Sequence, residues 1–95
     1  MAVMVLVEIP GLDQTKYDAV MKVLGLSKKG AKWPKGMVSH VAGADADGLS
    51  VTDVWASEKD FVKFRDGHLG PAFGKAGITA KPRIKILPVL NEWGK

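Results

Sequence analysis

The side chains best suited to acid–base chemistry in this sequence are His40 and Asp53. Each stands in an apolar stretch, residues 37–42 and residues 49–55. An unpaired imidazole or carboxylate is costly to bury, so we expect the two to be hydrogen-bonded to each other. A carboxylate beside an imidazole fixes the tautomer of the ring and raises its basicity. The pattern fits either a structural pair in the core or a general base in a pocket, and both interpretations stay open.

The position of a tight turn decides whether the two side chains meet. If the two stretches are strands, their side chains alternate between the two faces of the sheet. In the first strand Val38, His40 and Ala42 then share a face, and in the second strand Val51, Asp53 and Trp55 share a face. A two-residue turn at Ala46-Asp47 puts His40 opposite Asp53, whereas a turn at Asp47-Gly48 puts it opposite Trp55. Either register keeps His40, Asp53 and Trp55 on one face of the sheet.

His68 is the second histidine of the chain and the next candidate. It follows the apolar face of a predicted helix at the point where that helix is expected to break, which suits an acid or a substrate anchor at a pocket mouth. The alternative is an ordinary cation at a helix end. Aromatic side chains could form the walls of such a pocket, or simply core: Tyr17, Trp55, Phe61, Phe64 and Phe73.

The elements that must position these residues follow from apolar periodicity and helix signals. Residues 3–9 form an aliphatic run that predicts a strand. Thr15 with Asp18 has the form of a capping box, which predicts a helix that ends at Gly25. The segment 26–36 is a connection rich in lysine and glycine, and residues 37–55 predict a hairpin.

The second half of the chain repeats this plan. Ser57 opens a second helix, which Gly70 and Pro71 are expected to kink or break near His68 before a short helix over 73–76. A last strand follows over 84–90, where Pro88 predicts an edge position or a bulge. The order β-α-β-β-α-β predicts an α+β, ferredoxin-like domain over residues 1–95, a four-stranded antiparallel sheet with both helices on one face.

The uncovered face of such a sheet predicts self-association. The strands are apolar on both sides, and the chain has only two helical regions to cover them. We therefore expect a homodimer in which a second copy covers the outer face, the alternative being a monomer with a hydrated face. A core of this size, without disulfides, gains from the extra burial.

Composition limits the compartment and the chemistry. The 95 residues are 46% hydrophobic and 25% charged, as in an ordinary globular domain, with no run long enough to span a bilayer. The absence of cysteine removes thiol chemistry. Cytoplasmic location is the default expectation, without a membrane partner. Two histidines without metal-ligand spacing, and no glycine-rich phosphate loop, lead us to expect neither metal nor cofactor.

The formal net charge is +4, with basic residues concentrated at Lys28, Lys29, Lys32 and Lys35. Such a cluster could attract an anionic substrate or nucleic acid, but usually serves solubility. No nucleic-acid motif accompanies it, so we rank nucleic-acid binding last.

Several motifs together resemble small bacterial members of the dimeric α/β-barrel superfamily: Pro10-Gly11, Tyr17-Asp18, Pro34-x-Gly36, His40-Val-Ala-Gly43, Asp53-Val-Trp55-Ala-Ser57, Phe61-x-x-Phe64 and Leu69-Gly-Pro-Ala72. That superfamily includes cofactor-independent antibiotic-biosynthesis monooxygenases, polyketide cyclases, haem-degrading monooxygenases and stress-responsive proteins, so the resemblance implies fold more than activity. It also implies that Asp53 and Trp55 face the cavity beneath the helices, in company with His40.

The resemblance implies less for particular reactions. Phe64 stands where haem-degrading members have a tryptophan and Gly74 where they have a histidine, which disfavours haem degradation. A similar polyketide cyclase carries a tyrosine and a histidine that would fall at Phe64 and near His68, and the tyrosine is missing.

Our leading hypothesis is a cofactor-free monooxygenase or cyclase acting on a planar, phenolic molecule, with His40 as base, Asp53 orienting it and His68 as acid or anchor. The rival is a non-catalytic ligand-binding or stress-responsive dimer. A pocket of roughly 300 Å³ or more lined by these residues would favour the enzyme, and a filled interior the rival.

Overall fold

The chain forms its strands and helices in the predicted order. A computed structural model describes residues 1–26 and 33–93. The strands are β1 (Val3–Pro10), β2 (Met37–Asp45), β3 (Gly48–Trp55) and β4 (Arg83–Pro88). The helices are α1 (Gln14–Leu24), α2 (Glu58–Phe64) and α3 (Gly70–Lys75), the last two joined by a π-helical turn, Arg65–Leu69.

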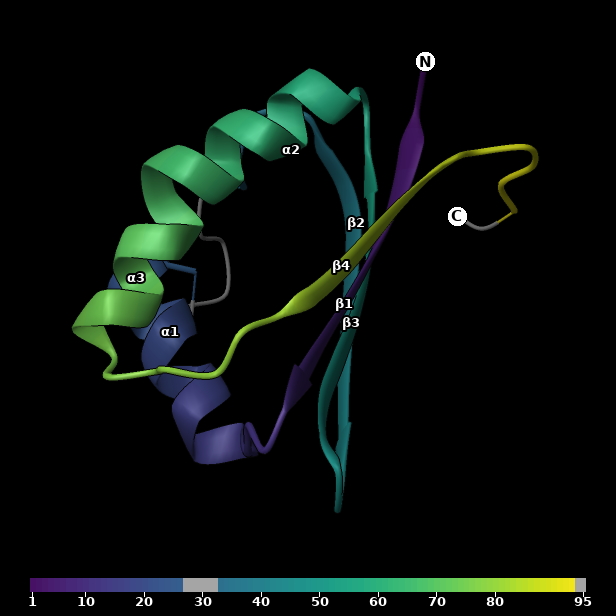
Figure 1. The fold of residues 1–95 in the computed structure, drawn as a ribbon. Helices are drawn as coiled ribbons and strands as arrows, with labels where there is room; N and C mark the ends of the chain where they lie inside the picture. Colours follow the sequence, from purple (N-terminus) through teal and green to yellow (C-terminus); the bar gives the residue numbers. More distant parts are fainter. Residues whose placement is uncertain (27–32, 94–95) are drawn as a thin grey trace.

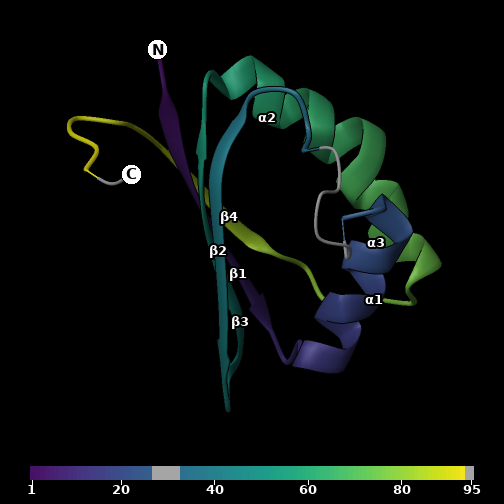
Figure 2. The same ribbon diagram turned by 180° about the vertical axis from the view of Figure 1, so that it is seen from behind.

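The four strands make one antiparallel sheet in the order β2-β3-β1-β4. The predicted ferredoxin-like α+β class is therefore confirmed, and Pro88 ends β4, which is an edge strand as expected. All helices lie on one side of the sheet, and no other element of the described chain covers the opposite side (Figures 1 and 2). None of the described helices is long and apolar enough to cross a membrane.

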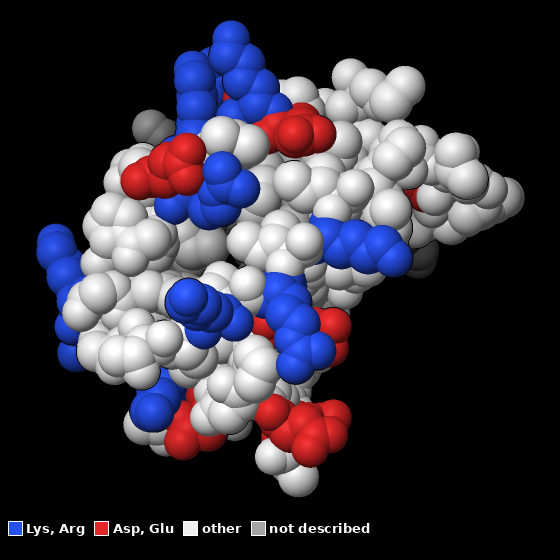
Figure 3. Space-filling view, in the orientation of Figure 1, with Lys and Arg blue, Asp and Glu red and all other residues white. Residues whose placement is uncertain are grey.

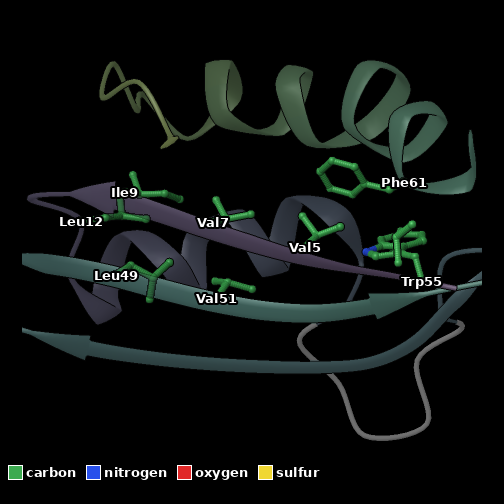
Figure 4. Close-up of a cluster of buried hydrophobic side chains, with 9 residues drawn as sticks. Val5, Val7, Ile9, Leu12, Leu49, Val51, Trp55 and Phe61 are labelled. Carbon is green, nitrogen blue, oxygen red and sulfur yellow. The ribbon is translucent and has the colours of Figure 1, made fainter. Parts of the chain in front are cut away.

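The core lies between the sheet and the helices. Odd-numbered residues of β1 are buried, whereas its even-numbered residues are half-buried or exposed, so in the single chain β1 is covered on one face. Figure 4 shows the buried side chains between the strands and the helical layer: Val5, Val7, Ile9, Leu12, Leu49, Val51, Trp55 and Phe61. Trp55 and Phe61 meet edge to face, with ring centroids 5.7 Å apart.

The first helix begins two residues earlier than its sequence pattern predicts. Asp13, not Thr15, is the N-cap, because its carboxylate accepts the Lys16 N–H at 2.9 Å. The prediction of Thr15 as cap is therefore wrong. Gly25 ends the helix as predicted, in the left-handed conformation, with its N–H bonded to the Lys22 carbonyl.

The second helix starts as predicted but does not break near His68. Ser57 caps α2 by accepting the Asp60 N–H at 3.2 Å. Beyond α2 the helix widens into the π-helical turn, in which the Gly70 N–H reaches back to the Arg65 carbonyl. The wider turn absorbs Pro71 at the start of α3, so of the predicted kink or break the structure shows a distortion without a break. The short helix covers 70–75 instead of 73–76.

Ala46-Asp47 forms the two-residue turn of the β2–β3 hairpin, which pairs Asp45 with Gly48. The Asp45 carboxylate accepts the N–H groups of Asp47 and Gly48 at 2.8 and 3.2 Å. Gly48 has φ +142°, and a Cβ there would collide with the backbone at the end of β1, 2.7 Å from the Gly11 nitrogen. Glycine at position 48 therefore helps to set the hairpin register.

Replacing Gly48 with alanine should lower the free energy of unfolding by about 1–3 kcal/mol, because the backbone conformation and the approach of β1 both oppose a side chain. Chemical denaturation measures this change. Gly43→Ala in β2 is the control, since a Cβ at Gly43 meets nothing within 4 Å. Equal effects of the two substitutions would contradict the role assigned to Gly48.

Candidate functional site

The hairpin brings His40 and Asp53 together. They are directly opposed in the β2–β3 register, as the Ala46-Asp47 turn predicts. His40 Nδ1 lies 2.6 Å from Asp53 Oδ1, and the two side chains are 15% and 8% exposed. The predicted pairing is therefore confirmed as a hydrogen bond on the face of the sheet beneath the helices.

A β-bulge near the start of β2 changes which residues accompany this pair. The register shifts between Met37 and Ser39, so Met37 rather than Val38 comes into line with Trp55. Val38 is 56% exposed, whereas Met37 packs against the core. The prediction that Val38 shares a face with His40 is wrong, because the extra residue inverts the alternation.

Asp53 is held at both carboxylate oxygens. Oδ2 accepts the indole Nε1–H of Trp55 at 3.3 Å, while Oδ1 faces His40. Trp55 is fully buried, so its indole cannot turn to water. A carboxylate can only accept hydrogen bonds, so the neutral His40 ring carries its proton on Nδ1 and Nε2 is the acceptor.

Tyr17 of α1 completes the chain of hydrogen bonds by donating its hydroxyl to His40 Nε2 at 2.7 Å. The two ring planes are 6° apart and their centroids are separated by 6.2 Å. This separation matches an in-plane hydrogen bond rather than face-to-face stacking, because the phenol oxygen lies between the rings. Sequence analysis assigned Tyr17 to an apolar wall and missed this role of its hydroxyl.

The sequence offered only a partial signal for that contact, the position of Tyr17 on an apolar helical face. Tyr17 lies on the same helical face as Val20, which is buried against the rest of the chain. His40 and Asp53 are on the sheet face that this helix covers. A tyrosine hydroxyl that enters an apolar layer needs a polar partner, and this pair supplies one.

Burial raises the pKa of Tyr17 above its ordinary value of 10.0, and the negative charges of Asp53 and Asp18 raise it further. Each of these influences disfavours the phenolate. The hydroxyl therefore keeps its proton at neutral pH and remains the donor to His40. No buried side-chain nitrogen or oxygen of the described residues lacks a hydrogen-bond partner.

An inner cavity of about 60 Å³ adjoins this network. Its walls include Tyr17, His40 and Asp53, and otherwise they are almost entirely apolar. This volume holds a few water molecules and lies well below the roughly 300 Å³ at which ligand pockets begin. In the single chain, the size of the inner cavity therefore favours the non-catalytic alternative.

The structure brings most predicted site residues together and separates one of them. Phe61, Phe64 and Phe73 line the inner cavity, and Trp55 lies behind Asp53. His68 does not reach this cavity. It is exposed on the far side of Phe64 and lines an outer hollow of about 300 Å³ between the end of α1 and the α2–α3 segment.

The remaining charged groups form no metal site in the described parts of the chain. Within residues 1–26 and 33–93, no three histidine, aspartate or glutamate side chains converge on a metal position. Lys28, Lys29 and Lys32 lie outside the described residues, and Lys35 is exposed. Figure 3 shows basic and acidic groups interspersed on the face in view.

Several solved structures share this architecture. A protein of unknown function from Nitrosomonas europaea, NE2512, has a TM-score of 0.72 at 16% identity, with 99% of this chain and 94% of that chain covered. SnoaB, a cofactor-independent oxygenase from Streptomyces nogalater, has a TM-score of 0.59 at 11% identity, covering 99% and 97%. The ActVA-Orf6 monooxygenase of Streptomyces coelicolor, solved with nanaomycin D, has a TM-score of 0.58 at 18% identity, covering 99% and 92%.

No protein-family model and no curated protein sequence matches the chain. The structural likeness at these identities concerns the fold. The resemblance stated from the sequence is confirmed at that level, because cofactor-independent oxygenases, monooxygenases and proteins of unknown function share this ferredoxin-like architecture.

The pKa of Tyr17 can be measured directly, because Tyr17 is the only tyrosine of the chain. Ultraviolet titration of tyrosinate should give a pKa above 10.0, and Asp53→Asn should bring it closer to the ordinary value by removing one negative charge. Since the folded-state pKa is the higher one, Tyr17 contributes stability below pH 10.0 that is lost as pH rises through the folded-state pKa. Titration at the ordinary value would contradict the buried contact.

Proposed function

We propose that this protein is a cofactor-independent monooxygenase-type enzyme that removes a proton from a planar, phenolic molecule and lets dioxygen react with the resulting anion. The observation that supports the proposal is the chain Tyr17–His40–Asp53, closed by Trp55, at an otherwise apolar cavity. Aligned donors and acceptors of this kind suit general base catalysis. Oxygenases among structures of the same fold raise the prior for this reaction class.

The hydrogen-bond directions suggest how the proton moves. His40 Nε2 is occupied by the Tyr17 hydroxyl, so a substrate meets the Tyr17 oxygen first. In the proposed step that oxygen accepts the substrate proton while its own proton passes to Nε2. The imidazolium so formed is stabilised by the Asp53 carboxylate 2.6 Å from Nδ1. Tyr17 thus never has to become a phenolate, which its raised pKa would oppose.

The subsequent chemistry uses dioxygen as the oxidant. The substrate carbanion donates electrons to dioxygen and a carbon–oxygen bond forms. The peroxide takes up the stored proton, and its oxygen–oxygen bond breaks as the same carbon loses its remaining hydrogen. A methylene thereby becomes a ketone and one water is released. The apolar cavity walls strengthen the hydrogen bonds that act on the developing charge.

The test is turnover of anthrone, a planar molecule whose enol is a phenol, followed by oxygen uptake and quinone formation in equal amounts. His40→Ala and Tyr17→Phe should each lower kcat by about 100-fold or more, the usual contribution of a positioned acid–base group. Ser39→Ala is the control, because Ser39 is an exposed neighbour of His40 in β2. Melting temperatures establish that the variants fold.

The outcomes separate the parts of this proposal. Loss of turnover in His40→Ala with full turnover in Tyr17→Phe would contradict the relay and leave His40 as a direct base. Undiminished turnover in both would exclude catalysis by this network. Absence of anthrone turnover by the wild type would instead favour the second candidate, a non-catalytic ligand-binding or stress-responsive protein, which the small inner cavity also supports.

We also propose that the domain of residues 1–95 acts as a homodimer in the cytoplasm. The sheet face without helices carries Val38 and Val41 with exposed fractions of 56% and 68%. Beyond β4, Leu90 and Trp93 are 96% and 89% exposed. Large apolar side chains concentrated on one side of a small domain favour association, and a second copy offers the same self-complementary face.

Val41→Lys should convert the dimer into monomers, because it places a charge on the sheet face proposed as the interface. Sedimentation velocity measures the change. Val23→Lys is the matched control, since Val23 is 44% exposed on α1, on the other side of the sheet, and should leave the dimer intact. A monomeric wild-type protein at micromolar concentration would contradict the dimer.

A further inference from the structure

The inner cavity and the outer hollow share three wall residues, Leu24, Leu26 and Phe64. Both leucines belong to the end of α1 and the residues that follow it, whereas Phe64 is the last residue of α2. The inner space measures about 60 Å³ and the outer one about 300 Å³. A thin layer of side chains therefore separates the inner cavity, which has a few polar groups in its wall, from an outer hollow large enough for an aromatic ring.

Phe64 is the aromatic member of this layer. Its ring packs on Trp55 with a centroid separation of 5.3 Å and on the His68 ring at 6.0 Å. On one side the Phe64 ring therefore contacts Trp55, whose indole is bonded to Asp53, and on the other side it borders the outer hollow. Phe64 is only half-buried, unlike Phe61, so moving its ring costs less packing.

The two compartments differ in chemistry. The inner cavity offers the Tyr17 hydroxyl and the His40–Asp53 pair, which suit a phenolic hydroxyl. The outer hollow has two polar side chains among its described wall residues, His68 and Lys75. No carboxylate stands among the described residues of its wall. That wall therefore suits an anionic group.

We propose that the two compartments are halves of one binding site, divided in the free protein by the Phe64 ring. The ligand is a phenol extended by a second fused ring that carries a carboxylate. Its hydroxyl reaches Tyr17 and its carboxylate faces His68 and Lys75, with Phe64 displaced. Phe64 accordingly sets the size of ligand that reaches the network. The choice of a phenol rests on the proposed function, whereas the division by Phe64 rests on the cavities alone.

The π-helical turn next to Phe64 gives its ring room to move. Helices with such a turn leave one backbone position without regular bonding, and they occur often at functional sites. Here the turn begins directly after Phe64 and contains Gly67, at which an added Cβ would meet no atom within 4 Å. The helix surface is therefore open at Gly67, three residues after Phe64.

The test compares three probes by calorimetry: phenol, a neutral naphthol, and a naphthol carboxylate with its hydroxyl and carboxylate on opposite rings. Phe64→Ala should bind both bicyclic probes at least tenfold more tightly than the wild type and leave phenol within threefold. Phe73→Ala is the matched control, because Phe73 is also half-buried and lines the inner cavity but not the outer hollow. It should give no preference for the bicyclic probes.

Lys75→Gln tests the outer half. It should weaken the carboxylate probe three- to tenfold and leave the neutral naphthol unchanged. Phe64→Leu, which keeps most of the packing on Trp55, should give a smaller gain than alanine and replaces Phe64→Ala if that variant does not fold.

Equal effects of the Phe64 and Phe73 substitutions would overturn the divided site, and equal effects of Lys75→Gln on both naphthols would overturn the anion position. These binding results are independent of turnover. If the binding pattern holds while anthrone is not oxidised, the proposed reaction fails and the divided site stands. If anthrone is oxidised but the binding pattern is absent, the divided site fails and the proposed reaction stands.

Discussion

The structure depends on one constraint, a carboxylate buried in an apolar sheet face. Asp53 is 5% exposed among valines, where an unsatisfied charge would cost several kcal/mol. His40 and Trp55 offset this cost, because each forms a hydrogen bond with one of the two Asp53 oxygens. His40 in turn needs a hydrogen-bond partner at Nε2, which the Tyr17 hydroxyl provides. Four side chains from β2, β3 and α1 are thereby tied together. The same arrangement that makes burial tolerable also aligns a proton path.

Local backbone features decide where this network sits. Gly48 and the Asp45 side chain set the hairpin turn and hence the pairing of His40 with Asp53. The bulge at the start of β2 keeps that register while it turns Val38 outward. On the helical side, the π-helical turn carries the chain past Pro71 without a break and leaves Phe64 between two cavities. The overall architecture is similar to that of solved bacterial oxygenases.

The two faces of the sheet pose different problems. The inner face is closed by helices so tightly that the space beside the network holds only water-sized molecules. The outer face has no cover within the described chain, although it carries valines on β2 that are more than half exposed. A small domain gains stability if a second copy covers such a face. Ligand access and self-association are thus separate matters, one on each side of the sheet.

The sequence alone determined the element order and the fold class. It left an edge position of β4 as one of two alternatives, and it predicted the His40–Asp53 pair under one of two turns. These depend on alternation, caps and turn residues, which act over a few neighbouring positions. Predictions from the sequence were less accurate where several local interactions compete for the same stretch of backbone. Asp13 displaced Thr15 as cap, and the helix absorbed Pro71 by widening. Only the tertiary structure brought the Tyr17 hydroxyl to His40 and placed Phe64 between them and His68, because packing between a helix and a sheet sets such contacts, and no local pattern encodes it.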